Sequence, residues 1–369
     1  MPCKDDAVLI NWITNDAELC SATAAWGSVI GIDTEFLRTN TFYPIPGLYQ
    51  IISNNDIYLI DPFAITDWQP LVEVLEDPAI EIVMHACSED LELIRHHFGA
   101  VPRGVFDTQL AHAFLSTDFS TSYANLVSST LDVTLGKHET RSNWLQRPLT
   151  DEQLRYACED VVHLPHLHAA LQAKLEAEGR LAWFRETMRD RGRYEPGDPD
   201  EYYRNVKKAW KLDGNSLAVL KVLAAWRERQ AMAEDVPRNR VIWDEHLYVF
   251  AELAVLDETI VWATLPKPVA RKYADEIIEQ HAIGLQAQAI DRLDRPLTQA
   301  QGALSKSLRD IARSHADQHE FAHELLARKR DVEGCVRHFV ATGELSPIYG
   351  GWRYDLVGDQ FREVLEQHQ

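Results

Sequence analysis

Short apolar runs alternate with helical patterns through the first half of the chain. Runs of this kind that are rich in β-branched residues predict buried strands. They lie at residues 29–37, 47–53, 56–62 and 79–86, and a shorter one opens the stretch 104–116 and runs into a helix. The alternation predicts an α/β domain with a mixed sheet, ending near residue 195.

Several predicted elements end in turn or capping residues. The sequence "SNND" at 53–56 has the composition of a hairpin turn. Ser88 is an N-cap candidate for a helix that ends just before Gly99. Asp107 is the N-cap candidate for the helix that follows the short strand.

A long helix begins near residue 150. Thr150 and Gln153 have the spacing of a capping box, and Pro165 predicts a kink or a break further along. Tyr156 and Asp160 are four residues apart on this helix, so their side chains stack on one face and can point at one site.

The second half of the chain is predicted to be helical. The stretch 193–204, "RYEPGDPDEYYR", is a Pro, Gly and acidic break, and a second break falls at 292–300. Between them, Leu217, Leu220, Leu223 and Trp226 recur at helical spacing. We therefore predict a first domain at 1–195 and two small all-α domains at 210–292 and 295–369, related as a weak repeat.

Composition places the chain among ordinary globular proteins. It has 369 residues, 46% hydrophobic and 25% charged, and no apolar run near the roughly 20 residues that span a bilayer. Its five scattered cysteines favour reduced thiols in the cytoplasm. The formal net charge of −20 argues against broad, sequence-independent binding of nucleic acid, but not against a grip on a strand end.

Carboxylates interrupt the apolar pattern of the first domain. Asp33 and Glu35 are two residues apart in the strand 29–37, so they project from one face. Asp90 falls in the first turn of a helix, and Asp160 lies beside Tyr156. Burying like charges together is unfavourable unless something compensates them.

Four convergent carboxylates fit a cage for hard divalent cations, which prefer oxygen ligands. Two such ions about 4 Å apart can hold the attacking and leaving oxygens of a phosphodiester, and a phenol can orient or deprotonate the water. Each residue alone has an ordinary interpretation: a common strand-end pair, an acid favoured by the helix dipole, or a surface Tyr–Asp pair. Their combination predicts a metal-dependent site.

These residues carry a resemblance to a known family. "GIDTEFLRTNTFYPIPGLYQ", "MHACSEDLELI" with "FDTQLA", and "YACEDVVHL" resemble the three motifs of DEDD-superfamily exonucleases, in the subclass with tyrosine in the last motif. "DTEFLRTNTFYP" and "HETRSNWLQRPLT" resemble bacterial ribonuclease D in particular, over residues 25–175. The helical part resembles HRDC modules, weakly after residue 295. Tyr49 departs from the family pattern, where an aliphatic residue is expected.

The resemblance implies a ribonuclease H-like sheet and 3′-to-5′ hydrolysis with two divalent cations, Mg²⁺ or Mn²⁺. It assigns the metal-binding acids to Asp33, Glu35, Asp90 and Asp160, and the water-orienting tyrosine to Tyr156. The partner it implies is RNA with single-stranded 3′ ends, such as precursor tRNA. We expect a cytoplasmic monomer that does not bind membranes.

Six further residues are candidates for substrate binding. Phe36 and Leu37 follow the acids directly and could wedge against a terminal base, although Phe36 could equally belong to the core. The segment 136–148 offers Lys137, Arg141, Trp144 and Arg147, since arginines hold phosphates and an aromatic ring can stack an unpaired base. The alternative is that Trp144 packs the loop and the cations are solvated.

Two other functions remain open from the residues. The same site could trim DNA, because no residue visibly reads a 2′-hydroxyl. Alternatively, the chain could be a non-catalytic RNA-binding or scaffold protein, although the intact set of acids argues against this.

The helical half is expected to supply a second contact for RNA. Residues 180–211 carry nine Lys and Arg against six Asp and Glu, and "KAWK" at 208–211 and "RERQ" at 227–230 could form basic faces. The break near residue 195 predicts that the first domain folds alone.

Overall fold

The computed structural model describes residues 8–136 and 142–367, which form two compact units. Unit 1 contains the chain up to Leu37, Pro46–Tyr194 and the chain from Leu297. Unit 2 contains Arg38–Ile45 and Glu195–Pro296. The third predicted domain, 295–369, is therefore grouped with the first predicted domain in unit 1. The short segment Arg38–Ile45 of the first predicted domain belongs to unit 2.

Unit 1 is built on a sheet of six strands. The sheet is mixed, as predicted. The strands are β1 (Ile10–Ile13), β2 (Val29–Leu37), β3 (Ile45–Ser53), β4 (Asp56–Ile60), β5 (Glu81–Met84) and β6 (Val105–Asp107). Their order is β1-β4-β3-β2-β5-β6. β3 and β4 are antiparallel, whereas β1 runs parallel to β4, and β5 runs parallel to both β2 and β6.

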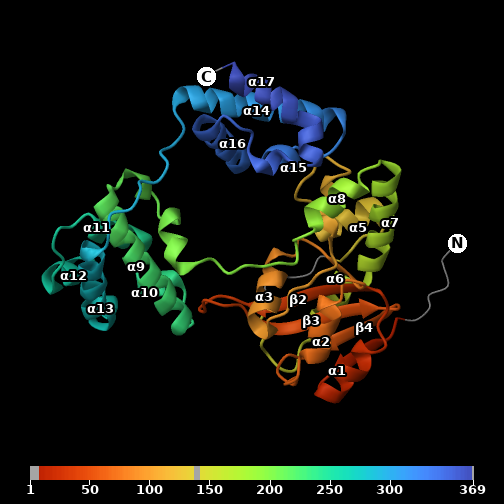
Figure 1. Cartoon of the computed structure of the whole chain (residues 1–369). Helices are drawn as coiled ribbons and strands as arrows, with labels where there is room; N and C mark the ends of the chain where they lie inside the picture. Colours follow the sequence, from red (N-terminus) through yellow and green to blue (C-terminus); the bar gives the residue numbers. More distant parts are fainter. Residues whose placement is uncertain (1–7, 137–141, 368–369) are drawn as a thin grey trace. The chain divides into compact units, whose positions relative to one another are not determined.

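Helices cover the sheet (Figure 1). Those before residue 195 are α1 (Asp16–Thr23), α2 (Gln69–Glu76), α3 (Ser88–Phe98), α4 (Thr108–Ala113), α5 (Tyr123–Leu131), α6 (Asp151–Val162), α7 (Leu164–Ala177) and α8 (Leu181–Met188). The core between sheet and helices is continuous, and it includes Tyr49, whose hydroxyl bonds Nδ1 of His97 at 2.8 Å. The unexpected tyrosine is thus accommodated by a polar partner at the end of its ring.

The local signals mostly predicted these boundaries. Asn54 and Asn55 have positive φ in the hairpin turn, and Gly99 ends α3 in the left-handed conformation. Asp107 caps α4. The N-cap predicted at Ser88 is wrong by one residue, because Ser88 is already helical and Cys87 precedes it.

The long helix is interrupted where proline predicts a break. Thr150 and Gln153 form a capping box at the start of α6, which ends at Val162, and Pro165 lies in the first turn of α7. Strand β1 was not predicted, because it is short and mostly solvent-facing, so its apolar pattern is weak.

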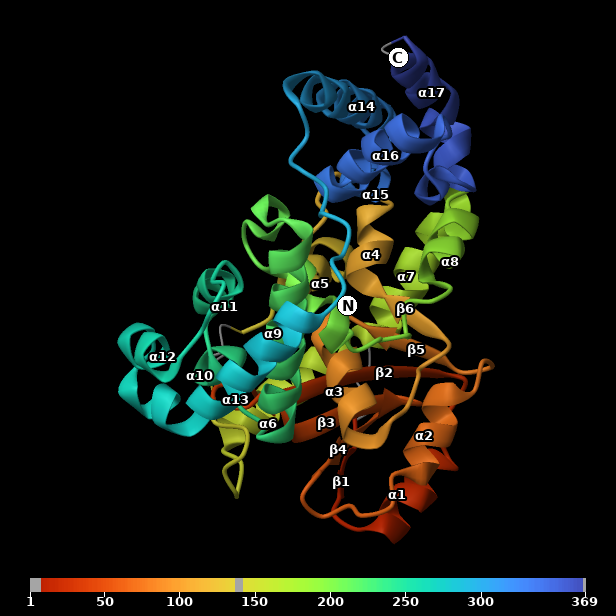
Figure 2. The same cartoon turned by 60° about the vertical axis from the view of Figure 1, so that its left-hand side comes forward.

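The C-terminal helices pack on the α/β part within unit 1, next to α4 and α8 (Figure 2). They are α14 (Gln299–Gln318), α15 (Glu324–Ala327), α16 (Lys329–Thr342) and α17 (Asp359–Glu366), with short helical turns at Pro347–Tyr349 and Tyr354–Gly358. Arg180 bridges the two parts by donating to the carbonyls of Phe114 and His319. The rings of Trp183 and Trp352 stack 5.4 Å apart. The prediction that residues 1–195 fold alone does not fit this shared core.

Unit 2 is a helical domain with its own core. Its helices are α9 (Gly214–Ala233), α10 (Arg238–Val241), α11 (Asp244–Ala251), α12 (Glu258–Thr264) and α13 (Lys267–Gln286), preceded by short 3₁₀ helices at Pro199–Asn205 and Ala209–Lys211. The predicted apolar stripe of α9 is buried. Both α9 and α14 have 20 residues and precede a four-residue helix, which favours the predicted repeat.

The structure also bears on membrane-spanning helices and on disulfides. No helix among the described residues is long and apolar enough to cross a membrane. Cys20, Cys87, Cys158 and Cys335 are free thiols, so the described cysteines form no disulfide.

Candidate active site

Strand β2 presents Asp33 and Glu35 on one face and Thr34 on the other. Ile30 and Ile32 are fully buried, which fixes the register of the strand against its neighbours. Both acids are half-buried, and they lie in the second half of the strand rather than at its end, because Phe36 and Leu37 continue it.

Helices α6 and α7 bring the remaining groups to β2. Gly31 allows this approach, because a Cβ there would lie 2.6 Å from Ile52 Cγ2 and 2.9 Å from Leu164 Cβ. Leu164 therefore rests directly on β2. Asp160 and Tyr156, one and two turns earlier, are half-buried on the adjoining helix.

The structure brings three predicted ligands together. Asp33, Glu35 and Asp160 each offer a carboxylate oxygen, and these oxygens lie within 4.8 Å of one another. Asp90 is buried and is not in this group of three. Its Oδ1 accepts a hydrogen bond from the Thr34 hydroxyl. Its charge nevertheless acts on Asp33, Glu35 and Asp160.

Burial and mutual repulsion raise the pKa of every acid in the site. Burial and then the charges of Asp90 and Asp160 raise the pKa of Asp33 well above its usual range. Burial, followed by the neighbouring acids, raises the pKa of Glu35 to about 9 and that of Asp160 to about 7. Burial raises the pKa of Asp90 to about 6, against the lowering effect of Thr34.

This donor set fits divalent cations. Oδ2 of Asp160 is buried and has no hydrogen-bond partner among the described residues. Converging carboxylate oxygens that repel one another without a cation are the ligands that Mg²⁺ and Mn²⁺ prefer. A bound cation would hold all four acids ionised and give the orphaned oxygen a partner.

Two tyrosines stand next to the acids. The Tyr156 hydroxyl is hydrogen-bonded to Asp160, and burial and the nearby carboxylates raise its pKa, so the phenol stays neutral. The Tyr123 hydroxyl donates to the carbonyl of Glu159 at 3.2 Å. Burial, with the charges of Asp160 and Asp33, raises the pKa of Tyr123 as well. Tyr123 was not predicted from the sequence, because α5 bears no motif.

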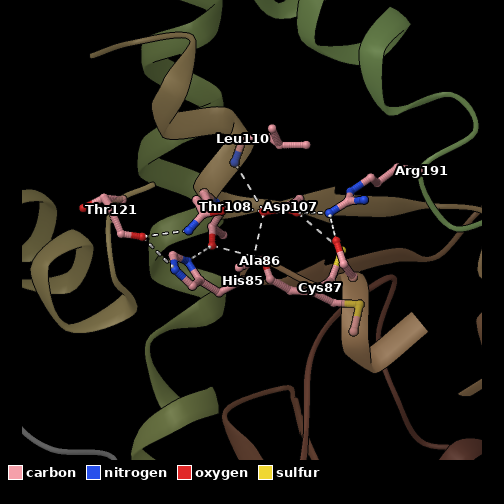
Figure 3. Close-up of polar contacts among 11 residues, drawn as sticks. His85, Ala86, Cys87, Asp107, Thr108, Leu110, Thr121 and Arg191 are labelled. Carbon is pink, nitrogen blue, oxygen red and sulfur yellow. Dashed lines mark hydrogen bonds and ion pairs between the residues drawn. The ribbon is translucent and has the colours of Figure 1, made fainter. Parts of the chain in front are cut away.

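A buried polar cluster holds the turn that leads to Asp90 (Figure 3). Asp107, fully buried, accepts from the backbone N–H of Ala86 and from Nη2 of Arg191, each at 3.1 Å. The Cys87 thiol also donates to Asp107. Ala86 has a φ of +53°, a strained value for a residue with a Cβ. The ion pair therefore holds a strained turn immediately before the helix that carries Asp90.

The same cluster continues through His85. Its Nδ1 bonds the Thr108 hydroxyl at 2.9 Å and its Nε2 bonds the carbonyl of Thr121 at 3.2 Å. The His85 ring also lies edge-on to Tyr123, with centroids 5.6 Å apart. The turn between β5 and α3 is thus tied to β6, α4 and the segment before α5.

The candidate substrate-binding residues have different surroundings in the structure. Leu37 shares the strand face of the acids, whereas Phe36 points to the other face and packs against the core. Trp144 is only 3% exposed, so it packs the loop and offers no free ring face. Arg147 pairs with Asp61 at 2.8 Å and donates to the carbonyl of Gly47. Lys137 and Arg141 lie outside the described residues.

Comparison with known proteins agrees with this geometry. The model of a 3′-5′ exonuclease family matches residues 10–176, and that of the HRDC domain matches residues 216–280. Ribonuclease D of Pseudomonas paraeruginosa is 40% identical over 97% of this chain and 98% of its own. Ribonuclease D of Escherichia coli is 33% identical over 96% of this chain and 98% of its own.

The fold agrees as well. The crystal structure of Escherichia coli RNase D, described as an exoribonuclease involved in structured RNA processing, superposes with a TM-score of 0.86 at 32% identity. The match covers 97% of this chain and 99% of that one. Because sequence and fold agree over nearly the whole length, the chain belongs to the ribonuclease D family.

Proposed function

We propose that this exoribonuclease removes nucleoside 5′-monophosphates one at a time from RNA 3′ ends, with two divalent cations, Mg²⁺ or Mn²⁺, held by Asp33, Glu35, Asp90 and Asp160. The observation that carries the proposal is the group of three carboxylate oxygens within 4.8 Å, with the Tyr156 hydroxyl bonded to one of the acids. When bound, the cations supply Lewis acidity to the scissile phosphate and lower the pKa of a water.

The acids have different tasks in this proposal. Asp33 would bind both ions, because the charges of Asp90, Asp160 and Glu35 all act on it. Glu35 and Asp160 would help to hold one ion. Asp90 would help to hold the second, partly through water, because its Oδ1 already accepts a hydrogen bond from Thr34.

Tyr156 positions the attacking water. Its proton is directed to Asp160, and a hydroxyl oxygen that donates its proton can also accept a hydrogen bond, here from water. A phenol whose pKa is raised above its ordinary value is a poor base at neutral pH. We therefore assign to Tyr156 the orientation of the water rather than its deprotonation.

The substrate class follows from the family. We propose single-stranded 3′ ends of structured RNAs, such as the trailer of precursor tRNA, as the physiological target. The Escherichia coli relative is described as acting in structured RNA processing. We further propose that the chain is a monomer and that it acts in the cytoplasm. The free thiols of the described cysteines agree with a reducing compartment.

The test is hydrolysis of 5′-labelled RNA by the full chain. A ladder that shortens from the 3′ end in Mg²⁺ or Mn²⁺, and that disappears with EDTA, supports the proposal. Parallel degradation of a DNA oligomer of the same sequence measures the preference for RNA. Equal rates on DNA would make the enzyme a general 3′ exonuclease, and hydrolysis that survives EDTA would contradict the metal mechanism.

A further inference from the structure

Unit 2 carries an aromatic and basic surface around one half-exposed tryptophan. Trp243 is 53% exposed and its indole has no hydrogen-bond partner among the described residues. It lines two hollows, of about 740 and 1,020 Å³, which share Asn239 and Trp243 in their walls. A large exposed ring between two concave surfaces is not explained by the packing of the helical core.

Three tyrosine rings line the same two hollows as Trp243. Tyr202 and Tyr248 line the first, and Tyr273 lines the second. Tyr202 is covered by the guanidinium groups of Arg227 and Arg238, at 4.6 and 5.1 Å from its centroid. No Lys or Arg of the part of the chain that the structure describes lies over the Trp243 ring, and the ring is half exposed, so it can contact a ligand.

The charge of this surface differs from that of the whole chain. The residues that line the two hollows and a third at Arg38–Phe42 include seven Lys and Arg but four Asp and Glu, in a chain of net charge −20. Lys207, Lys208 and Arg240 are exposed and, among the described residues, make no ion pair. Positive charge interleaved with aromatic rings fits an unpaired nucleic-acid strand.

The predicted basic face at 227–230 does not contribute in the expected way. Arg227 is 1% exposed and is paired with Glu228 and Asp244. Arg229 is exposed but is paired with Asp200. Of the two basic stretches expected from the sequence, the one at 208–211 supplies this surface with an exposed cation, Lys208. The other supplies only Arg227, which is buried and paired.

The wall of the second hollow belongs to the chain that leaves the catalytic strand. Thr39 and Asn40 line it, and Phe42 and Tyr43 are fixed by their N–H groups to Oδ1 of Asp235, each at 3.0 Å. Thr39 follows Glu35 by four residues, a covalent span of at most about 14 Å. The residues that directly continue β2 along the chain therefore line part of this hollow.

We propose that Trp243, with Lys207, Lys208 and Arg240, is a stacking site for an unpaired base of the RNA strand upstream of the reacting 3′ end. The inference rests on the proposed function and adds the place where the strand is gripped. A base stacks on the open face of Trp243, and the three unpaired cations neutralise neighbouring phosphates. The site is tolerant of sequence, because every base has a π face.

The experiment compares binding of two single-stranded oligoadenylates, a trinucleotide and a 15-mer, to the full chain in EDTA by fluorescence anisotropy. Trp243→Ala should weaken binding of the 15-mer by roughly 5- to 100-fold, the range expected for one lost base stack. Trp243→Phe should restore most of the affinity. Trp262→Ala is the matched control, because Trp262 is also exposed, on α12, and bonds Glu258.

Salt dependence separates the roles of the ring and the cations. Lys207→Ala with Lys208→Ala should lower the slope of log affinity against log salt by about 1.4, at 0.7 for each phosphate contact on a single strand. Trp243→Ala should leave that slope unchanged. A blunt RNA duplex should compete poorly, since its bases cannot stack on a side chain.

Three outcomes would overturn the inference. Trp243→Ala could bind the 15-mer as tightly as wild type or Trp262→Ala, a duplex could compete equally, or the loss could be the same for the trinucleotide and the 15-mer. In the first case a protein partner becomes the better occupant. Hydrolysis of the trinucleotide by wild type in Mg²⁺ tests the proposed function independently, so failure of one idea is distinguishable from failure of the other.

Discussion

The hydroxyl of Thr34 donates to Oδ1 of Asp90, so the residue between the two strand acids holds a third acid from the opposite face of the strand. The residues are 56 positions apart, and both side chains are buried. The Asp-x-Glu motif thus places two acids in the candidate site from its ends and holds a third acid from its middle.

Replacing Thr34 should weaken the metal site without emptying it. Thr34→Val keeps the shape of the side chain but leaves Oδ1 of Asp90 without its donor, which raises the pKa of Asp90 further. We expect the Mg²⁺ concentration for half-maximal hydrolysis to rise by roughly 10- to 100-fold, as for other groups that orient metal ligands. Thr34→Ser should stay near wild type, and an unchanged Mg²⁺ dependence in Thr34→Val would contradict the role.

Asp33→Asn should abolish hydrolysis and stabilise the metal-free fold. The substitution removes a carboxylate whose oxygen lies within 4.8 Å of those of Glu35 and Asp160. If the cations lower the activation free energy by several kcal/mol, their loss slows hydrolysis by about 10³-fold or more. It also removes one of four mutually repelling charges. Rates and thermal midpoints in EDTA test both effects, with the exposed Glu152→Gln as control. Near wild-type cleavage would contradict the metal assignment.

Tyr156→Phe should slow turnover while leaving RNA and metal binding intact. The phenol is hydrogen-bonded to Asp160, so its loss would remove the proposed alignment of the water. We expect kcat to fall by roughly 10²- to 10⁴-fold at unchanged KM. Tyr123→Phe is the comparison, because that hydroxyl donates to a backbone carbonyl. A large rise in KM at constant kcat would instead make Tyr156 a binding residue.

The sequence predicted that Asp33, Glu35 and Asp160 converge because their signals are local. The alternation of β2 and the four-residue spacing on α6 are each contained in a few positions, and the capping box fixes where α6 begins. The proline break after α6 was visible for the same reason.

Local sequence signals could not predict the groups that hold the acids of the site in place. Asp107 was recognised only as a cap, although it also holds Ala86, and its partner Arg191 is 84 residues away. Trp144 suggested stacking because it lies in a polar loop. It is buried because Gly47 lets it approach, since a Cβ there would lie 2.6 Å from that of Trp144. Such contacts depend on tertiary packing.

Bound Mg²⁺ should increase the stability of the fold more at high pH than at low pH. Glu35 has an ordinary pKa of 4.5 and one of about 9 in the metal-free fold, so the unfolded chain ionises first and the fold is penalised progressively between these values. In EDTA the protein should therefore be more stable near pH 5 than near pH 9. Mg²⁺ should raise the thermal midpoint more at pH 9. Glu35→Gln should reduce the difference, and an equal effect of Mg²⁺ at both pH values would contradict the linkage.

Removing the C-terminal helices should destabilise the catalytic part. A chain that ends at Tyr194 uncovers Phe114 and Trp183, which pack against Trp352, and leaves Arg180 without the carbonyl of His319. Each large side chain uncovered costs about 2 kcal/mol. The fragment should therefore unfold at lower urea than the full chain and should bind a hydrophobic dye. The control joins Tyr194 to Leu297 through a flexible linker in place of residues 195–296, which keeps the shared core of unit 1. That chain should unfold at higher urea than the fragment. If the fragment is as stable as this control, the C-terminal helices are not part of the catalytic fold.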